Sequence, residues 1–253
     1  MKKRTRHPVI AVAQIKYYDI HKRNNVEKIK RYIKLAKKKH ADIVCFPESC
    51  VSKTKTLHFD DEFIKQIKEE CKKNKIWAII TEDIILKNKP YNISFLINRE
   101  GRIKGNYKKI HLYDEDGLNS GKKTQVFKTD FGKVGIVICW DLAFPDLFKK
   151  MKKSGAQIVF CPAQWAYEKK AHESQHKKRE IEILRSLVLS RAFENGYFIA
   201  LCNPVRKYES EQVSYSAIVS PHKVLKEISN KEGLIVSEIN LKEIENYHKL
   251  YPI

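Results

Sequence analysis

The sequence predicts an α/β fold in which two β-sheets pack together and helices cover their outer faces. Short runs rich in β-branched residues alternate with lysine-rich amphipathic stretches along the whole chain. The order of strands and helices in the first half then returns, approximately, in the second half. No linker-like or low-complexity segment separates the halves, so we expect one domain over residues 1–253.

The first half opens with three strand-like runs, at residues 8–15, 41–48 and 76–83. Apolar residues at helical spacing lie between these runs. They are Val26, Ile29, Ile33 and Ala36 in the first interval, and Phe63, Ile64, Ile67 and Cys71 in the second. Asp60 or Asp61 can cap the start of the second helix.

Two β-hairpins are expected next, because glycine-containing turns separate runs of strand-forming residues. The first covers residues 91–110, with its turn at Arg99–Gly101. The second covers residues 125–139, with its turn at Asp130–Gly132. A helix then follows Cys139.

The rest of the second half contains further strands and helices. The helix after Cys139 is expected to end at Gly155 as its C-terminal cap. A strand at 156–165 and a long helix that stops at Asn195-Gly196 come next, followed by a strand at 196–204. The segments SYSAIVSPHKVLKEIS and GLIVSEINL predict an antiparallel set of strands, and NYHKLYPI a tail that packs on the body.

The chain is strongly basic, with 50 Lys and Arg against 30 Asp and Glu and a formal net charge of +20. Clustered basic residues would indicate a nucleic-acid-binding protein, and this class stays an alternative. Here the lysines are spread along nearly every predicted helix, as in KIKRYIKLAKKKH, which is typical of a solubilising surface. We therefore expect no nucleic-acid partner. The lysine excess also suggests an anionic substrate.

Neither a membrane nor a secreted location is indicated. No apolar stretch is long enough to cross a bilayer, and the basic N-terminus passes directly into a strand-like run without a cleavage site. The six cysteines are scattered and form no CxxC pair; they are Cys45, Cys50, Cys71, Cys139, Cys161 and Cys202. This distribution predicts reduced thiols in a cytoplasmic protein that has no membrane partner.

One cysteine stands where an α/β protein can display a nucleophile. Cys139 ends the apolar run of residues 134–139, and the chain then turns sharply toward a helix. The free N–H groups at the start of a helix lower a thiol pKa and can bind an oxyanion. On its own, however, Cys139 is more simply explained as a buried hydrophobic residue.

Charged residues at two other strand ends strengthen the catalytic interpretation. Glu48 lies where the run 41–48 stops, and Lys108 and Lys109 close the second strand of the first hairpin. Ligands bind outside the carboxyl ends of strands in α/β sheets, so these side chains and Cys139 are expected to converge. A carboxylate can take the thiol proton, and a cation can stabilise the anion that forms on the attacked carbon.

The same three segments carry a family resemblance. FPE at 46–48, YKKIHL at 107–112 and GIVICWDLAFPD at 135–146 resemble the Glu, Lys and Cys motifs of the nitrilase superfamily of carbon–nitrogen hydrolases. The resemblance extends over nearly the whole chain and includes PAQW and LSRAFENGYFIALCNP. It implies a four-layer αββα sandwich that forms a homodimer or a higher homo-oligomer through its helical face.

The resemblance also implies a role for each motif residue. Glu48 matches the general base and Cys139 the nucleophile. Lys109, which precedes Ile-His-Leu, matches the motif lysine rather than Lys108, and together with the N–H of Trp140 it would hold the oxyanion. The implied reaction is hydrolysis of a small-molecule amide through a cysteine thioester, with no metal and no organic cofactor. A nitrile or an N-carbamoyl substrate stays an alternative within the same family.

Further residues are candidates around this site. The family often carries a second glutamate in the loop after the lysine; the loop HLYDEDGLNSG is short here, and Glu115 is the best match. A solvated acidic turn explains Glu115 nearly as well. Residues expected to line the substrate pocket are Tyr113, Trp140, Gln164 and Trp165.

A competing motif occurs at residues 169–180, where His172, Glu173 and His176 form H-E-x-x-H. On a helix, the two imidazoles could bind zinc, with the glutamate as the base of a metalloprotease. A zinc-binding helix of that kind is half buried, whereas KKAHESQHKKRE is charged all round. We favour the hydrolase and expect no metal.

Overall fold

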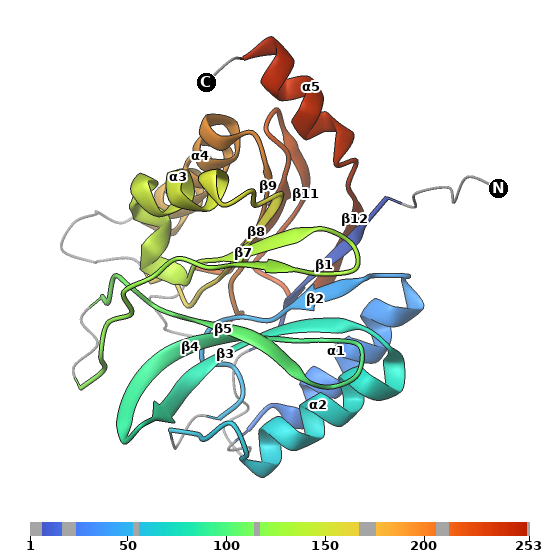
Figure 1. Ribbon diagram of the computed structural model, residues 1–253, viewed down its shortest axis with the longest axis vertical. Coiled ribbons are helices and arrows are strands. Elements are labelled where there is room, and N and C mark those ends of the chain that lie inside the picture. The colour runs from blue at the N-terminus through green and yellow to red at the C-terminus, as the bar shows by residue number, and fades with distance from the viewer. Residues whose placement is uncertain are drawn as a thin grey trace.

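Two six-stranded sheets lie face to face, with helices on the outer side of each (Figure 1). The computed structural model describes residues 7–16, 24–52, 56–113, 117–166, 176–205 and 213–251. The helices on the first sheet are α1 (Val26–Lys38) and α2 (Glu62–Asn74), and those on the second are α3 (Pro145–Lys153) and α4 (His176–Asn195). The four-layer αββα arrangement expected from the sequence is confirmed.

The first sheet has the strand order β12-β1-β2-β3-β4-β5. Its strands are β1 (Val9–Gln14), β2 (Ile43–Cys45), β3 (Trp77–Leu86), β4 (Lys89–Ile97), β5 (Ile103–Lys108) and β12 (Gly233–Glu238). The central strands β1, β2 and β3 are parallel, and the other neighbours pair antiparallel. Parallel pairing places the carboxyl ends of β1, β2 and β3 at one edge of the sheet.

The second sheet repeats this plan in the order β11-β10-β9-β8-β7-β6. Its strands are β6 (Val126–Lys128), β7 (Lys133–Ile136), β8 (Ile158–Pro162), β9 (Phe198–Cys202), β10 (Tyr215–Val219) and β11 (Val224–Ser229). Here β7, β8 and β9 are the parallel strands. The parallel strands at the middle of one sheet therefore face the parallel strands at the middle of the other.

The alternation of side chains along the strands divides the core into layers. On β1, Ile10 and Val12 point between the two sheets, whereas Ala11 and Ala13 point toward α1 and α2. The apolar stripe of α1 is buried as its spacing predicts. Asp61 caps α2 by accepting a hydrogen bond from the Phe63 N–H, which decides between the two candidate caps.

The final strand differs from its expected position. β12 does not join β10 and β11 in an antiparallel set but pairs with β1 in the first sheet. All six residues of β1 are buried, so its free edge needs a strand partner to satisfy the backbone N–H and C=O groups. β12 supplies them and closes that edge.

Two other local expectations also need correction. β3 runs beyond residue 83 to Leu86 and forms a tight hairpin with β4, in which Lys87 and Asn88 both have positive φ. After Cys139 the chain forms a 3₁₀ turn, η1 (Cys139–Ala143), before α3 begins at Pro145. Proline disfavours the helical conformation in the residue before it, which explains the break at Phe144.

The C-terminal segment is a helix rather than a simple tail. α5 (Lys242–Leu250) begins after Asn240, whose side chain accepts a hydrogen bond from the Lys242 N–H. Tyr247 is fully buried, and its hydroxyl donates a hydrogen bond to the Phe193 carbonyl at the end of α4. The segment does pack on the body, as expected, but through one face of a helix.

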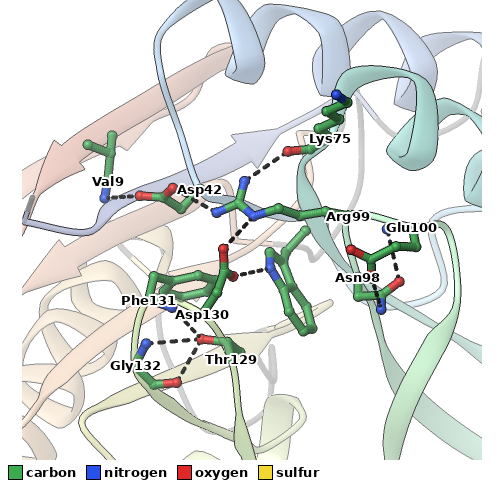
Figure 2. Close-up of polar contacts among 11 residues, drawn as sticks. Val9, Asp42, Lys75, Asn98, Arg99, Glu100, Thr129, Asp130, Phe131 and Gly132 are labelled. Atoms are coloured by element: carbon green, nitrogen blue, oxygen red, sulfur yellow. Dashed lines mark hydrogen bonds and ion pairs between the residues drawn. The ribbon is translucent and has the colours of Figure 1, made fainter.

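A charged cluster ties the two sheets together at the amino-terminal ends of the parallel strands (Figure 2). The Arg99 guanidinium donates to Asp42 at 2.8 Å, to the Lys75 carbonyl at 2.8 Å and to Asp130 at 2.7 Å. The Trp77 indole also donates to Asp130, at 2.6 Å. We call these five residues the Arg99 cluster. It joins both predicted hairpin turns to the loops that lead into β2 and β3.

Candidate active site

The three motif side chains meet at the opposite end of the sandwich. Glu48 follows β2, Lys109 directly follows β5, and Cys139 comes after β7. The Lys109 ammonium donates a hydrogen bond to Glu48 Oε1 at 2.9 Å, and both side chains are almost completely buried. All three line one cavity of about 460 Å³. Strand ends from both sheets thus bring together groups that are far apart in the sequence.

The backbone at Cys139 is unusual. Its φ of +47° lies in the left-handed region, which non-glycine residues rarely adopt. The preceding Ile138 is extended, so the chain reverses direction at the cysteine itself and enters η1. Backbone conformations of this kind occur where the surrounding structure holds a reactive group in place. The sharp turn predicted from the sequence is therefore present.

Burial and Glu48 both keep the Cys139 thiol protonated at rest. Burial raises the pKa of the Cys139 thiol well above its usual range, and the charge of Glu48 raises it further. Lys109 and the backbone N–H of Gln164 act in the opposite direction and favour the thiolate. Because Glu48 and Cys139 line the same cavity, Glu48 is placed to accept the thiol proton when a substrate arrives.

Glu48 is oriented by groups on two sides. Its Oε1 accepts the Lys109 hydrogen bond, and its Oε2 accepts a hydrogen bond from the Gln164 N–H at 2.9 Å. The Glu48 N–H in turn donates to the Ala163 carbonyl at 3.3 Å. The loop after β8 in the second sheet therefore fixes a carboxylate that belongs to the first sheet.

Glu82 supports the loop that follows Glu48. Its carboxylate is buried and accepts hydrogen bonds from the N–H groups of Val51 at 2.7 Å and Ser52 at 3.1 Å. Burial raises the pKa of Glu82 to about 8, although these hydrogen bonds lower it. The residue lies on β3, under the loop and outside the cavity-lining set.

Asp141 connects the lysine strand to the cysteine turn. This fully buried carboxylate accepts hydrogen bonds from the Tyr107 hydroxyl at 2.7 Å, the His111 N–H at 2.9 Å and the Ile138 N–H at 3.1 Å. Tyr107 and His111 flank Lys109, and Ile138 precedes Cys139. Asp141 therefore fixes the lysine and the thiol relative to each other.

The loop after Lys109 returns tightly to the strand. The Gly121 N–H donates to the Lys109 carbonyl at 2.7 Å. A Cβ atom at Gly121 would lie 2.2 Å from the Lys108 carbonyl oxygen, so only glycine permits this approach. Lys108 itself points away from the site and lies over the Tyr91 ring, 4.0 Å from its centroid. The structure thus separates the two neighbouring lysines, with Lys109 inward.

Aromatic side chains form one wall of the cavity. The Trp140 ring lies 4.9 Å from that of Tyr113 and 5.5 Å from that of Trp165, measured between centroids. The Trp165 indole donates a hydrogen bond to Glu180 on α4 at 2.6 Å. Together with Gln164, these three aromatic residues are the predicted pocket residues, and the structure places all four in the cavity lining.

Other lining residues were not identified from the sequence. They are Ser49, Asp83, Asn92, Leu118, Ala166 and Glu180. Asp83 and Asn92 face each other across the β3–β4 hairpin. A polar pair in apolar strands is a signal that could have been found, but only if the hairpin had been placed at Lys87-Asn88.

Glu115 lies outside the described residues, and so do His172 and Glu173 of the H-E-x-x-H motif. His176 begins α4, but its side chain is not described. Within the described part of the chain, no group of three or more His, Cys, Asp or Glu side chains is arranged to hold a metal ion.

Comparison with known proteins now identifies the family. The model of the carbon–nitrogen hydrolase family matches residues 9–249 of the chain. The chain belongs to the carbon–nitrogen hydrolases. This family placement confirms the resemblance of the three motifs to the nitrilase superfamily, and it makes the protein a hydrolase of carbon–nitrogen bonds.

Two relatives of this carbon–nitrogen hydrolase carry amidase names. The chain is 28% identical over 243 residues to the 2-oxoglutaramate amidase of Bacillus subtilis, covering 90% of this chain and 89% of that protein. It is 25% identical over 274 residues to the omega-amidase NIT3 of Saccharomyces cerevisiae, covering 96% of this chain and 91% of that protein.

The fold of this hydrolase is shared with solved structures. The crystal structure of Saccharomyces cerevisiae Nit3, a member of branch 10 of the nitrilase superfamily, superposes with a TM-score of 0.85 at 24% identity. The match covers 98% of this chain and 95% of that chain. Among the described helices of the hydrolase, none combines the length and the apolar character that a bilayer crossing requires.

Proposed function

We propose that this protein hydrolyses the amide bond of a small molecule through a thioester on Cys139. The observation that carries the proposal is the convergence of Glu48, Lys109 and Cys139 in one cavity, with the thiol on a strained turn. The amidase names of the two relatives support an amide in preference to the alternative nitrile or N-carbamoyl substrates.

Acylation begins when Glu48 accepts the thiol proton and the Cys139 sulfur attacks the amide carbonyl carbon. The carbonyl π-electrons move to oxygen, and the Lys109 ammonium and the Trp140 N–H stabilise the resulting oxyanion. Trp140 is the second residue of η1, where a helical turn has backbone N–H groups to offer. The tetrahedral intermediate then collapses, Glu48 gives its proton to the nitrogen, and ammonia or an amine leaves.

Deacylation reverses the roles of the same groups. Glu48, now ionised again, accepts a proton from water as the hydroxide oxygen attacks the thioester carbon. The oxyanion is held as before, the carbon–sulfur bond breaks, and the proton returns from Glu48 to the Cys139 sulfur. The products are a carboxylic acid and the free thiol. Because the reaction needs no electron acceptor, the proposal includes no cofactor.

The direct test is ammonia release from a panel of primary amides by the purified protein. We expect hydrolysis of at least one amide, loss of that activity on alkylation of thiols, and no effect of a metal chelator. Hydrolysis that survives in Cys139→Ala would refute the thioester route. If a chelator abolishes the activity and thiol alkylation does not, the result would instead favour a zinc metalloprotease that uses the H-E-x-x-H motif.

We further propose that the protein forms a homodimer through its helical face. Large apolar side chains are exposed on and just after α4 and α5, namely Ile183, Phe193, Leu250 and Tyr251. The rings of Phe193 and Tyr251 are in contact, with their centroids 5.4 Å apart, and contiguous exposed apolar side chains mark association surfaces. Sedimentation of the wild type as a dimer, and of Ile183→Glu as a monomer, is the expected result. A wild-type monomer would contradict it.

A cytoplasmic location is proposed on the basis of the cysteines. All six are free and buried. Free thiols are the rule in the reducing cytosol, whereas exported proteins of oxidising compartments use disulfides. A fluorescent fusion that collects outside the cytoplasm would contradict this proposal.

A further inference from the structure

We propose that the substrate carries a cationic group, of the primary ammonium type, and that Asp83 binds this group while the amide carbonyl lies at Cys139. The proposal rests on the proposed function and names the chemical class of its substrate. Its basis is the charge and geometry of the cavity wall formed by the β3–β4 hairpin.

Asp83 is presented to the cavity by a rigid pair of strands. It lies on β3 opposite Asn92 on β4, and the Asn92 side-chain amide donates to Asp83 Oδ1 at 2.9 Å. The Asn92 carbonyl accepts a hydrogen bond from the Lys109 N–H at 3.0 Å, which fixes the pair relative to the reacting groups. No described residue donates a hydrogen bond to Asp83 Oδ2. A ligand donor can therefore take that position.

The described part of the cavity lining carries more carboxylates than cations. Among the described lining residues, the carboxylates are Glu48, Asp83 and Glu180, and the one cation is Lys109. Lys109 is already hydrogen-bonded to Glu48. A carboxylate on the substrate would lie near these protein carboxylates in a site of low dielectric and would be repelled. An ammonium on the substrate would be attracted to them.

The titration of Asp83 agrees with this geometry. Burial raises the pKa of Asp83, and the nearby charge of Glu48 raises it further, against the opposing effects of Asn92 and Lys109. Among the described residues, the Asn92 amide is the side-chain donor to the Asp83 carboxylate. A bound ammonium would supply a positive charge and the hydrogen bonds that Asp83 can accept.

The aromatic wall suits the same ligand. The rings of Tyr113, Trp140 and Trp165 follow one another around the cavity. Their faces can cover the methylene groups of an aliphatic amide, and they attract cations more than anions. An ω-amino amide combines the three features that the cavity recognises: an amide, an alkyl chain and an ammonium.

The basic surface does not argue against a cationic substrate. The lysines that dominate the net charge lie largely on solvent-exposed helix faces, such as the outer face of α1. Charges in solvent are screened over about 10 Å at moderate ionic strength, whereas groups inside the cavity act on the ligand directly. The described cavity wall therefore favours a cationic substrate over the anionic one that the lysine excess suggests.

The test compares three amides that each have three methylene groups: γ-aminobutyramide, valeramide and glutaramate, which carry an ammonium, a methyl and a carboxylate at the far end of the chain. Homologues of each with fewer or more methylene groups extend the series. We expect the wild type to show a kcat/KM at least roughly tenfold higher for the best ammonium amide than for its neutral match. The carboxylate amide is expected to be the poorest substrate at every length.

The preference should depend on Asp83. In Asp83→Asn, which keeps the side-chain shape, the ratio of kcat/KM for the ammonium amide to that for the neutral amide should fall to about one. The exposed Asp60→Asn is the matched control and should keep the wild-type ratio. As a second measurement on the wild type alone, butylammonium should inhibit competitively at lower concentration than butyrate.

Three outcomes are distinct. Cys139-dependent hydrolysis with no preference, or with a preference for glutaramate, overturns the inference about Asp83 and leaves the proposed function standing. An ammonium preference that survives in Asp83→Asn also overturns it. Failure of every amide in the series, together with an unmodified Cys139, refutes the proposed function and the inference with it.

Discussion

The molecule holds two clusters of charged side chains at opposite ends of the same sandwich. Asp42 precedes β2 and belongs to the Arg99 cluster, whereas Glu48 follows β2 and belongs to the candidate active site. Lys109 is paired with one carboxylate, that of Glu48, whereas Arg99 is paired with two, those of Asp42 and Asp130. The two clusters differ in burial: the Lys109 and Glu48 side chains are 1% and 4% exposed, against 22% for Arg99 and 54% for Asp130.

This difference in burial indicates that the Arg99 cluster stabilises the fold, whereas the candidate active site is suited to a reaction. In the Arg99 cluster the guanidinium donates to three acceptors, Asp42, the Lys75 carbonyl and Asp130, which belong to segments that lead into or connect strands (Figure 2). Although burial lowers it, the pKa of Arg99 is raised by Asp130 and Asp42. At the other end, burial raises the pKa of the Cys139 thiol, its backbone is strained and a cavity opens beside it.

The largest expected effect is that of Cys139→Ala. Without the sulfur no thioester can form, so kcat for any amide substrate should fall by about 10⁴-fold or more, to the background rate. Ammonia release measures it. Cys71→Ala, at a buried cysteine of α2, is the control and should retain activity. Equal losses in both variants would mean that the assay reports folding rather than chemistry.

Lys109→Met should lower kcat by about 10²- to 10³-fold, because one oxyanion donor is lost. The variant also leaves Glu48 buried beside an apolar group, which destabilises the fold. The double variant Glu48→Gln/Lys109→Met removes both charges and should unfold at a temperature equal to or above that of the wild type, while staying inactive. A double variant much less stable than the wild type would show that this pair is a structural tie like the Arg99 cluster.

The pH dependence of the free energy of unfolding tests the role of Glu82, which holds the loop after Glu48. Since burial raises the pKa of Glu82 from 4.5 to about 8, the native protein binds a proton that the unfolded chain releases. The free energy of unfolding should therefore decrease as pH rises from about 4.5 to about 8, by up to a few kcal/mol through this group. In Glu82→Gln that contribution is absent, so its stability relative to the wild type should increase with pH across this window.

Denaturant titrations at several pH values measure this difference. Glu69→Gln, at an exposed position on α2, provides the control and should follow the wild-type curve. If Glu82→Gln loses stability relative to the wild type as pH rises, the sign of the pKa shift is wrong.

The smallest expected effect concerns the other end of the molecule. Arg99→Met removes three hydrogen bonds of a partly exposed cluster and should lower the free energy of unfolding by roughly 1–3 kcal/mol. The kcat of the folded protein should stay within about twofold of the wild type, because the site lies at the far ends of the strands. A large loss of kcat with unchanged stability would show that the two ends are coupled.

Much of this structure could be predicted because strong periodic patterns were present. The apolar stripes of α1 and α2 predict helices with one buried face. The apolar, β-branched run of β1 predicts a buried strand. Short-range motifs also identified Glu48, Lys109 and Cys139, whose meeting follows from the rule that the carboxyl ends of parallel strands share an edge.

What could not be predicted depended on long-range or weakly encoded choices. β12 pairs with β1 because β1 needs an edge partner, and no local pattern states which sheet a late strand joins. The turn at Lys87-Asn88 contains no glycine to mark it in the sequence. The β3–β4 hairpin and its Asp83–Asn92 pair were therefore not predicted. Asp141 was visible only as a neighbour of Trp140, because its hydrogen bonds to Tyr107, His111 and Ile138 exist only in the folded chain.

The most direct test of the account is to trap the acyl group. Glu48→Gln cannot activate water, so thioester formed slowly from an amide substrate, or from a more reactive ester of the same acid, should accumulate. Intact-protein mass spectrometry should show a mass increase equal to that of the acyl group, and peptide mapping should locate it on Cys139. An adduct on another cysteine, or amide hydrolysis with Cys139 unmodified throughout turnover, would contradict the account.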